Sequence, residues 1–181
     1  MKEMSKNPEA FGKLINTIVS ITDINGMLTE VVDEIREYIG ADRCSLYILD
    51  SNKNELYTRV ALDCELEEIR VPIDKHSLIG YSVVTDTVLN INDAYNDKEL
   101  KRIDEDLFFN AEFDKLGHYK TQSVLCMAIK HQNNTIGAFQ VINKPGGFLQ
   151  QNVQAMNEFA PIIALAINNA IMEDKVREIN S

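Results

Sequence analysis

The chain has 181 residues, of which 45% are hydrophobic and 25% are charged, with 8 glycines and 4 prolines. This composition is typical of one soluble globular domain, and a chain of this length buries about 70% of its unfolded surface without metal or disulfide cross-links. Acidic residues outnumber basic residues 28 to 18, which gives a net charge of -10. Such a charge excludes nonspecific attraction to a nucleic-acid backbone or an anionic membrane, so no nucleic-acid partner is expected.

The three cysteines, Cys44, Cys64 and Cys126, form no CxxC pair and are odd in number. No secretory leader is recognised before them, which indicates a reduced, cytoplasmic chain. The apolar run that comes closest to a membrane span, from Ile162 to Ile167, is far shorter than the roughly 20 residues that cross a bilayer. Direct insertion into a membrane is therefore not expected.

Apolar residues recur every three or four positions over residues 11–19 and again over residues 28–39. This spacing predicts two amphipathic helices. Asp23 is suited to cap the second helix, and Gly40 is suited to end it in a left-handed conformation.

From Asp42 onward the apolar period changes to two, which predicts a strand followed by a turn over residues 50–54 and a return strand over residues 55–62. A short strand is expected over residues 68–73. Residues 77–84 are expected to form a short helix, capped by Ser77 or Asp74, with unpaired backbone N–H groups at its N-terminus.

Residues 92–120 combine polar residues with five aromatic ones, which is too aromatic for a disordered linker and favours a structured lid. A second hairpin is predicted from residues 123–130 and 135–143, and a long helix from residue 148 toward Ile179. Terminal helices around a strand-rich middle indicate an α+β fold with an antiparallel sheet and the helices on one face.

In this order, residues 24–172 resemble a GAF domain of the type found in cyclic-nucleotide phosphodiesterases, bacterial adenylate cyclases and sensor kinases. The segments that carry the resemblance are 41–47, 68–73, 78–81, 89–95, 119–126 and 141–144. The resemblance implies a six-stranded antiparallel sheet, with the N- and C-terminal helices packed on one face and a ligand pocket under a lid on the other. Residues 1–23 would then be a connector or dimerisation helix. Residues 173–181 would lead toward an output domain, such as a cyclase or kinase, that is not in this chain.

The resemblance also implies a set of ligand-binding residues. Ser45 and Gln140 would read the base, Leu62 and Asp63 would stack on it and contact it, and Thr121 would bind the phosphate. Backbone N–H groups of the short helix would bind the phosphate, and the lid would contribute a carboxylate and an aromatic ring. The full set is Ser45, Leu62, Asp63, Leu78, Ile79, Gly80, Phe109, Asp114, Thr121 and Gln140.

Three of these residues also have a purely structural interpretation. Ser45 suits a strand as a small residue, Asp63 suits a solvated strand end, and Gln140 can pair with the backbone. The chain also departs from the family pattern, because Asn152-Val153 replaces an Asp-Glu pair whose Asp is expected to pair with Lys144.

Together these features predict a regulatory sensor domain that binds cAMP or cGMP and relays the signal through a helical homodimer. The alternative is a ligand-free dimerisation module. A redox enzyme acting through Cys126 is a third possibility, although buried thiols are usually inert. No catalytic residue, metal or cofactor is expected, because the three histidines lie singly and no metal-ligand cluster occurs in the sequence.

Overall fold

The computed structural model describes residues 8–21, 23–62 and 68–180. Its elements follow the order α1 (Pro8–Ser20), α2 (Ile24–Ile39), β1 (Arg43–Asp50), β2 (Glu55–Leu62), β3 (Arg70–Pro72), α3 (Leu78–Thr85), β4 (Leu89–Ile91), α4 (Asp97–Ile103), α5 (Glu112–Leu116), β5 (Val124–His131), β6 (Asn134–Ile142) and α6 (Gln150–Ile179).

The strands form one six-stranded sheet in the order β3-β2-β1-β6-β5-β4. Every neighbouring pair in it is antiparallel. This confirms the α+β fold with a six-stranded antiparallel sheet. The central strand β1 is buried on both faces from Cys44 to Ile48, so alternate side chains belong to two different layers of the domain.

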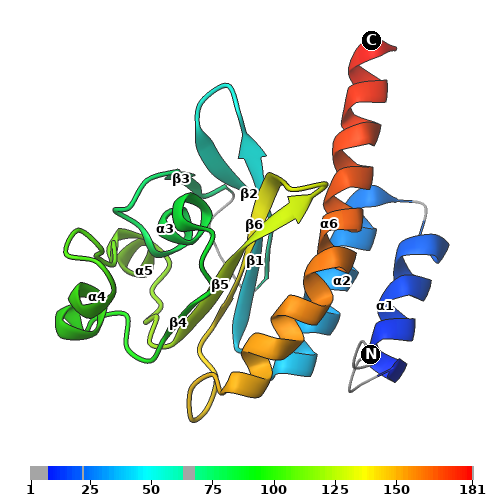
Figure 1. Cartoon of the computed structure of the whole chain (residues 1–181). Coiled ribbons are helices and arrows are strands. Elements are labelled where there is room, and N and C mark those ends of the chain that lie inside the picture. Colours follow the sequence, from blue (N-terminus) through cyan, green and yellow to red (C-terminus); the bar gives the residue numbers. More distant parts are fainter. Residues whose placement is uncertain (1–7, 22, 63–67, 181) are drawn as a thin grey trace.

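The terminal helices α1, α2 and α6 pack together on one face of the sheet (Figure 1). They bury the larger apolar cluster, to which β1 contributes Cys44, Leu46 and Ile48. The expected helix ends of α2 are also present, because the Asp23 side chain accepts a hydrogen bond from the Gly26 N–H and Gly40 has φ 76°.

The opposite face of the sheet is covered by α3, α4 and α5, which follow one another between β3 and β5 (Figure 1). This layer buries a second apolar cluster, which includes Tyr47, Leu100 and Leu107. Residues 92–120 are therefore an ordered cover, as expected, and contain α4 and α5. The three-residue strand β4 that precedes them was not located from the sequence pattern.

The 30-residue helix α6 is long and apolar enough, by length and composition alone, to pass a test for a membrane-spanning helix. Half of its most apolar window is nevertheless buried inside the domain. Because Met156, Phe159 and Ile163 on this helix pack in the core against the sheet, its hydropathy is accounted for by the fold.

Gly137 in β6 lies opposite Ile48 in the pairing with β1. A Cβ atom at this position would collide with the backbone carbonyl oxygen of Tyr47 and crowd the Ile167 side chain of α6. The close approach of the two central strands thus depends on the absence of a side chain at this position.

We expect Gly137→Ala to lower the free energy of unfolding by about 1–3 kcal/mol, because the added methyl group overpacks two central strands. Gly12 in α1 is the matched control, since a Cβ there meets nothing within 4 Å. Gly12→Ala should raise the free energy of unfolding by about 0.5–1 kcal/mol through helix propensity. Urea unfolding of both variants measures the difference, and equal effects would contradict the packing argument.

Candidate functional site

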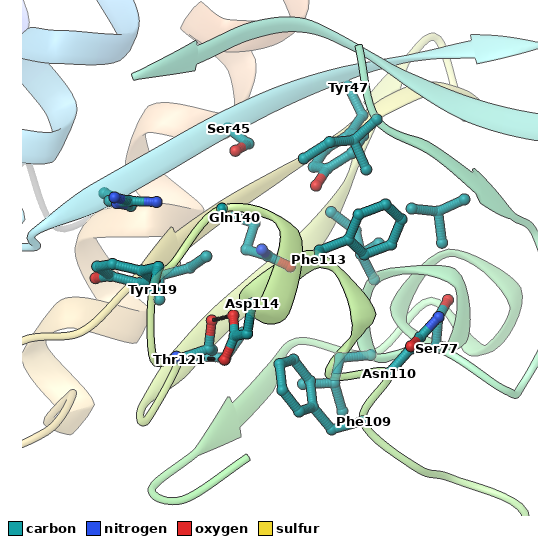
Figure 2. A pocket seen from close by; sticks show the side chains of 18 of the residues that line it. Ser45, Tyr47, Ser77, Phe109, Asn110, Phe113, Asp114, Tyr119, Thr121 and Gln140 are labelled. Atoms are coloured by element: carbon teal, nitrogen blue, oxygen red, sulfur yellow. Dashed lines mark hydrogen bonds between the residues drawn. The ribbon is translucent and has the colours of Figure 1, made fainter. Parts of the chain in front are cut away.

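A cavity of about 120 Å³ lies between the sheet and the cover made by α3 and residues 109–120. Its floor is formed by β1, β5 and β6, and its sides by α3, α5 and the ends of β2 and β3 (Figure 2). Most of the lining is apolar. Such a concave, mainly apolar site with a few polar groups is the usual form of a small-molecule site.

Ser45 and Gln140 lie directly opposite each other on neighbouring strands β1 and β6. Both line the cavity, and Figure 2 shows the Gln140 amide in its middle. Neither side chain forms a hydrogen bond with another residue in the described part of the chain. These two groups are therefore available to a ligand, and the structural pairing considered for Gln140 is not observed there.

The N-terminus of α3 also borders the cavity, through Ser77, Leu78 and Ile79. The Ser77 hydroxyl caps the helix by accepting a hydrogen bond from the Gly80 N–H at 3.0 Å. Within the described residues, the backbone N–H groups of Leu78 and Ile79 have no acceptor. Two donors at the positive end of a helix dipole can bind an anionic group.

Gly80 does not line the cavity, although the sequence placed it in the ligand-binding set. A Cβ on Gly80 would come within 2.5 Å of the Pro72 carbonyl oxygen and of the Ser77 hydroxyl. Its absent side chain therefore allows α3 to pack against the segment after β3, which positions the neighbouring N–H groups.

Asp114 and Thr121 are both buried and bind each other. The Thr121 hydroxyl donates to one Asp114 carboxylate oxygen at 2.7 Å, and the Thr121 N–H donates to the other at 2.7 Å. The Tyr95 hydroxyl also donates to this carboxylate, at 2.7 Å, and that hydrogen bond raises the pKa of Tyr95. Asp114 and Thr121 were both expected to contact the ligand. In this conformation they bind each other instead and hold the cover closed.

The aromatic ring of Phe109 lines the cavity and packs edge-on against Tyr95, with ring centroids 5.2 Å apart. Phe113 and Asn110 line the same side of the cavity. Leu62 at the end of β2 lines it as well, while Asp63 lies outside the described residues. Of the ten residues in the expected set, eight therefore line the cavity.

Two lining residues that the sequence did not single out are Arg43 and Tyr119. The Arg43 guanidinium carbon lies 3.5 Å from the centroid of the Tyr119 ring, a cation–π contact. Burial, together with the hydrogen bond from its hydroxyl to Asp42, raises the pKa of Tyr119. Arg43 belongs to the 41–47 segment that carries the resemblance, but its pairing with Tyr119 depends on the tertiary fold.

Lys144 lacks the Asp partner that the family pattern implies, because Asn152 stands at that position. Other contacts take the place of this ion pair. The Lys144 ammonium donates to the Ile39 carbonyl oxygen at the C-terminus of α2. The Asn152 side chain donates to the same oxygen at 3.5 Å, and its amide oxygen accepts from the Leu149 N–H at 2.9 Å. A cation at the negative end of a helix dipole is stabilising, so Lys144 connects the end of β6 to α2, although none of the described acidic residues pairs with it.

Cys44 and Cys126 are buried and form no disulfide with each other, and Cys64 lies outside the described residues. Burial raises the pKa of the Cys126 thiol to about 12, which disfavours the nucleophilic thiolate. Over residues 8–21, 23–62 and 68–180, no group of three His, Cys, Asp or Glu side chains is arranged to bind a metal ion.

The sequence of this chain is similar to a known domain family and to known proteins. A family model for the GAF domain matches residues 23–167. The chain is 31% identical over 170 residues to a probable 3',5'-cyclic phosphodiesterase of Caenorhabditis elegans, covering 87% of this chain and 22% of that protein. It is 30% identical over 177 residues to a dual 3',5'-cyclic-AMP and -GMP phosphodiesterase 11A of Takifugu rubripes, covering 90% of this chain and 18% of that protein.

Among solved structures, the GAF domain of a phosphoenolpyruvate-protein phosphotransferase from Coxiella burnetii superposes with a TM-score of 0.77 at 18% identity. That match covers 92% of this chain and 95% of the other. The chain thus spans about a fifth of the length of the phosphodiesterases it matches, and nearly all of this solved domain.

We expect Thr121→Val to loosen the cover, because it removes one hydrogen bond to the buried Asp114 carboxylate while keeping the side-chain shape. The free energy of unfolding should fall by about 1–3 kcal/mol. Amide hydrogen exchange of residues 107–121 should accelerate. Thr135→Val is the matched control in β6, since the Thr135 hydroxyl makes no hydrogen bond within the described residues; its effect should stay within about 0.5 kcal/mol. Unchanged exchange in the Thr121 variant would contradict the role of this contact.

Proposed function

The chain belongs to the GAF domain family, and we propose that it is a sensor domain that binds a cyclic purine nucleotide, cAMP or cGMP, in the cavity over the sheet. A GAF domain is a regulatory fold. The name of the Takifugu relative contains cyclic AMP and cyclic GMP, and that of the Caenorhabditis relative a 3',5'-cyclic phosphodiesterase. The proposal assigns the domain a binding role and no catalytic role. Its place in the cell is the cytoplasm, as the cysteine content suggests.

The observation that carries the proposal is a set of polar groups around one apolar cavity that have no partner among the described residues. The free N–H groups of Leu78 and Ile79 suit a cyclic phosphate, and the Ser45 hydroxyl and Gln140 amide suit a purine edge. An amide and a hydroxyl can each donate and accept, which matches the mixed donors and acceptors of a base. The apolar lining between them suits the ring faces of the base.

The cavity of about 120 Å³ is smaller than the roughly 300–1,000 Å³ of typical small-molecule sites. A nucleotide therefore requires residues 109–120 of the cover to move outward. The Asp114 hydrogen bonds hold that cover, so ligand binding and these bonds depend on each other. A ligand that binds the open conformation better shifts the population toward it.

We propose that strand β2 transmits ligand binding from the pocket to the terminal helices. Strand β2 contributes Leu62 to the cavity, and a β-bulge opposite Leu46 and Tyr47 makes Arg59 an extra residue in the same strand. Arg59 forms an ion pair with Asp174 of α6 at 3.4 Å. A shift of β2 on ligand binding would thus act on the last turns of α6.

We expect millimolar cAMP or cGMP to raise the thermal stability of the domain. At a hundred times its dissociation constant, the ligand should add about 2.7 kcal/mol. Gln140→Leu should reduce the shift, because it leaves an apolar group against the base edge. Gln154→Leu, an exposed change on α6, is the matched control and should leave the shift intact. No thermal shift with either nucleotide would contradict cyclic-nucleotide binding.

The proposed output is a homodimer formed through the terminal helices, which would act on an attached output domain such as a cyclase or kinase. Exposed apolar side chains on α6 follow a heptad spacing: Leu165 (46% exposed), Met172 (53%), Val176 (55%) and Ile179 (84%). Asn169 interrupts them at a seam position, where a single polar residue commonly sets the register of a coiled coil. Residues 1–23 and 173–181 would then be connector segments on either side of a domain spanning 24–172.

The alternative is a dimerisation module that binds no ligand. The closed hydrogen-bonded cover and the small cavity favour it, and the α6 stripe is common to both proposals. The thermal-shift measurement separates the two, because only the sensor gains stability from a nucleotide.

We expect Val176→Asp to shift the protein from dimer to monomer in light scattering, because it places a charge in the apolar stripe of α6. Leu116→Asp is the matched control, since Leu116 is 59% exposed on α5 and Val176 is 55% exposed. The control should leave the mass unchanged. A wild-type monomer at high concentration would contradict the dimer proposal.

A further inference from the structure

Arg43 is a charged side chain in the pocket that has no assigned role. It begins β1 and lines the cavity, and its guanidinium lies over the Tyr119 ring. Within residues 8–21, 23–62 and 68–180, it makes no hydrogen bond or ion pair. An arginine carries five N–H donors in a planar fork, so stacking on a ring leaves this fork available to a ligand.

The Tyr119 ring that supports Arg43 is itself fixed. Its hydroxyl donates to the Asp42 carboxylate at 2.5 Å and accepts from the Asn143 side-chain amide at 2.9 Å. The Asn143 amide oxygen in turn accepts from the Gln122 N–H at 2.7 Å. Because this chain of contacts fixes the ring, the guanidinium plane is held before any ligand arrives, which lowers the entropy cost of binding.

Arg43 lies beside the two free polar groups of the cavity floor. In the β1–β6 pairing, Arg43 lies opposite Ile142 and Ser45 lies opposite Gln140, so Arg43, Ser45 and Gln140 share one end of the same sheet face. Among the described lining residues, the other charged group is Asp114, and its carboxylate already accepts from Tyr95 and Thr121. The unpaired charge in the cavity is therefore positive and belongs to Arg43.

This end of the cavity is separate from the helix N-terminus. Figure 2 shows Ser77, the cap of α3, on the side opposite Tyr119, with Gln140 between them. A nucleotide with its phosphate at Leu78 and Ile79 would place its base toward Gln140 and Arg43. We propose that Arg43 makes this pocket select guanine over adenine by donating two hydrogen bonds to the O6 and N7 atoms of the base. This inference rests on the proposed function.

The selectivity follows from the donors and acceptors on each purine. Guanine presents two acceptors, O6 and N7, on one edge, which matches the arginine fork. Adenine presents N7 as an acceptor and its N6 amino group as a donor, and that donor opposes the guanidinium N–H groups. A correct bidentate pair discriminates between bases by about fivefold to a hundredfold. The pocket should therefore bind cGMP more tightly than cAMP.

The test is calorimetric titration of the wild-type chain and the variant Arg43→Met with cGMP, cIMP and cAMP. Methionine keeps an unbranched stem against Tyr119 and removes the donors. Wild type should bind cGMP and cIMP at least about fivefold more tightly than cAMP, since hypoxanthine has the same O6 and N7 acceptors and lacks only the 2-amino group. In Arg43→Met, the affinities for cGMP and cIMP should fall to that for cAMP, with cAMP itself little changed.

Arg70→Met is the matched control, because Arg70 also lies over a tyrosine ring, that of Tyr57 at 5.2 Å, and does not line the cavity. Its cGMP-to-cAMP ratio should equal that of wild type, and thermal unfolding verifies that both variants fold. An equal fall in cGMP and cAMP affinity in Arg43→Met overturns the proposal, because it assigns Arg43 to the phosphate. Equal wild-type affinities also overturn it while leaving nucleotide binding intact. Binding of neither nucleotide overturns both proposals.

Discussion

The central strand β1 is buried on both faces, and this double burial organises the rest of the structure. Its residues Cys44, Leu46 and Ile48 pack with the terminal helices, while Arg43, Ser45 and Tyr47 face the cavity. Because side chains alternate strictly along a strand, one strand is shared by the cavity and the helical layer. A change in the cavity floor therefore acts on residues that also support α2 and α6.

Polar contacts close the margin of the cavity together with apolar packing by Phe109 and Phe113. Asp114 joins the cover to Thr121, which precedes β5, and Tyr119 joins it to Asp42, which precedes β1. Hydrogen bonds to a carboxylate are directional and can exchange partners, whereas a filled apolar core resists opening. A cover closed in this way is suited to open for a ligand and close over it.

The sequence was sufficient to predict the elements whose signal lies within a few neighbouring residues. The period of apolar residues with Asp23 and Gly40 predicted α2, because caps and periodicity act within a few residues. Ser77 or Asp74 was expected to cap α3, and the structure has Ser77 as the cap. The contacts of Thr121 with Asp114 and of Arg43 with Tyr119 could not be predicted, because they join segments that only the tertiary fold brings together. Eight of the residues that line the cavity belong to the set that the resemblance implied. The resemblance did not indicate which of them bind each other.

The most direct test of the account is an NMR titration of the amide resonances with cGMP. If a cyclic phosphate binds at the start of α3, the largest amide shifts should occur at Leu78 and Ile79, because their N–H groups gain an acceptor that the described chain does not provide. Smaller shifts should follow in the cover around Thr121. Shifts that leave Leu78 and Ile79 unchanged at saturation would contradict the sensing role of this pocket.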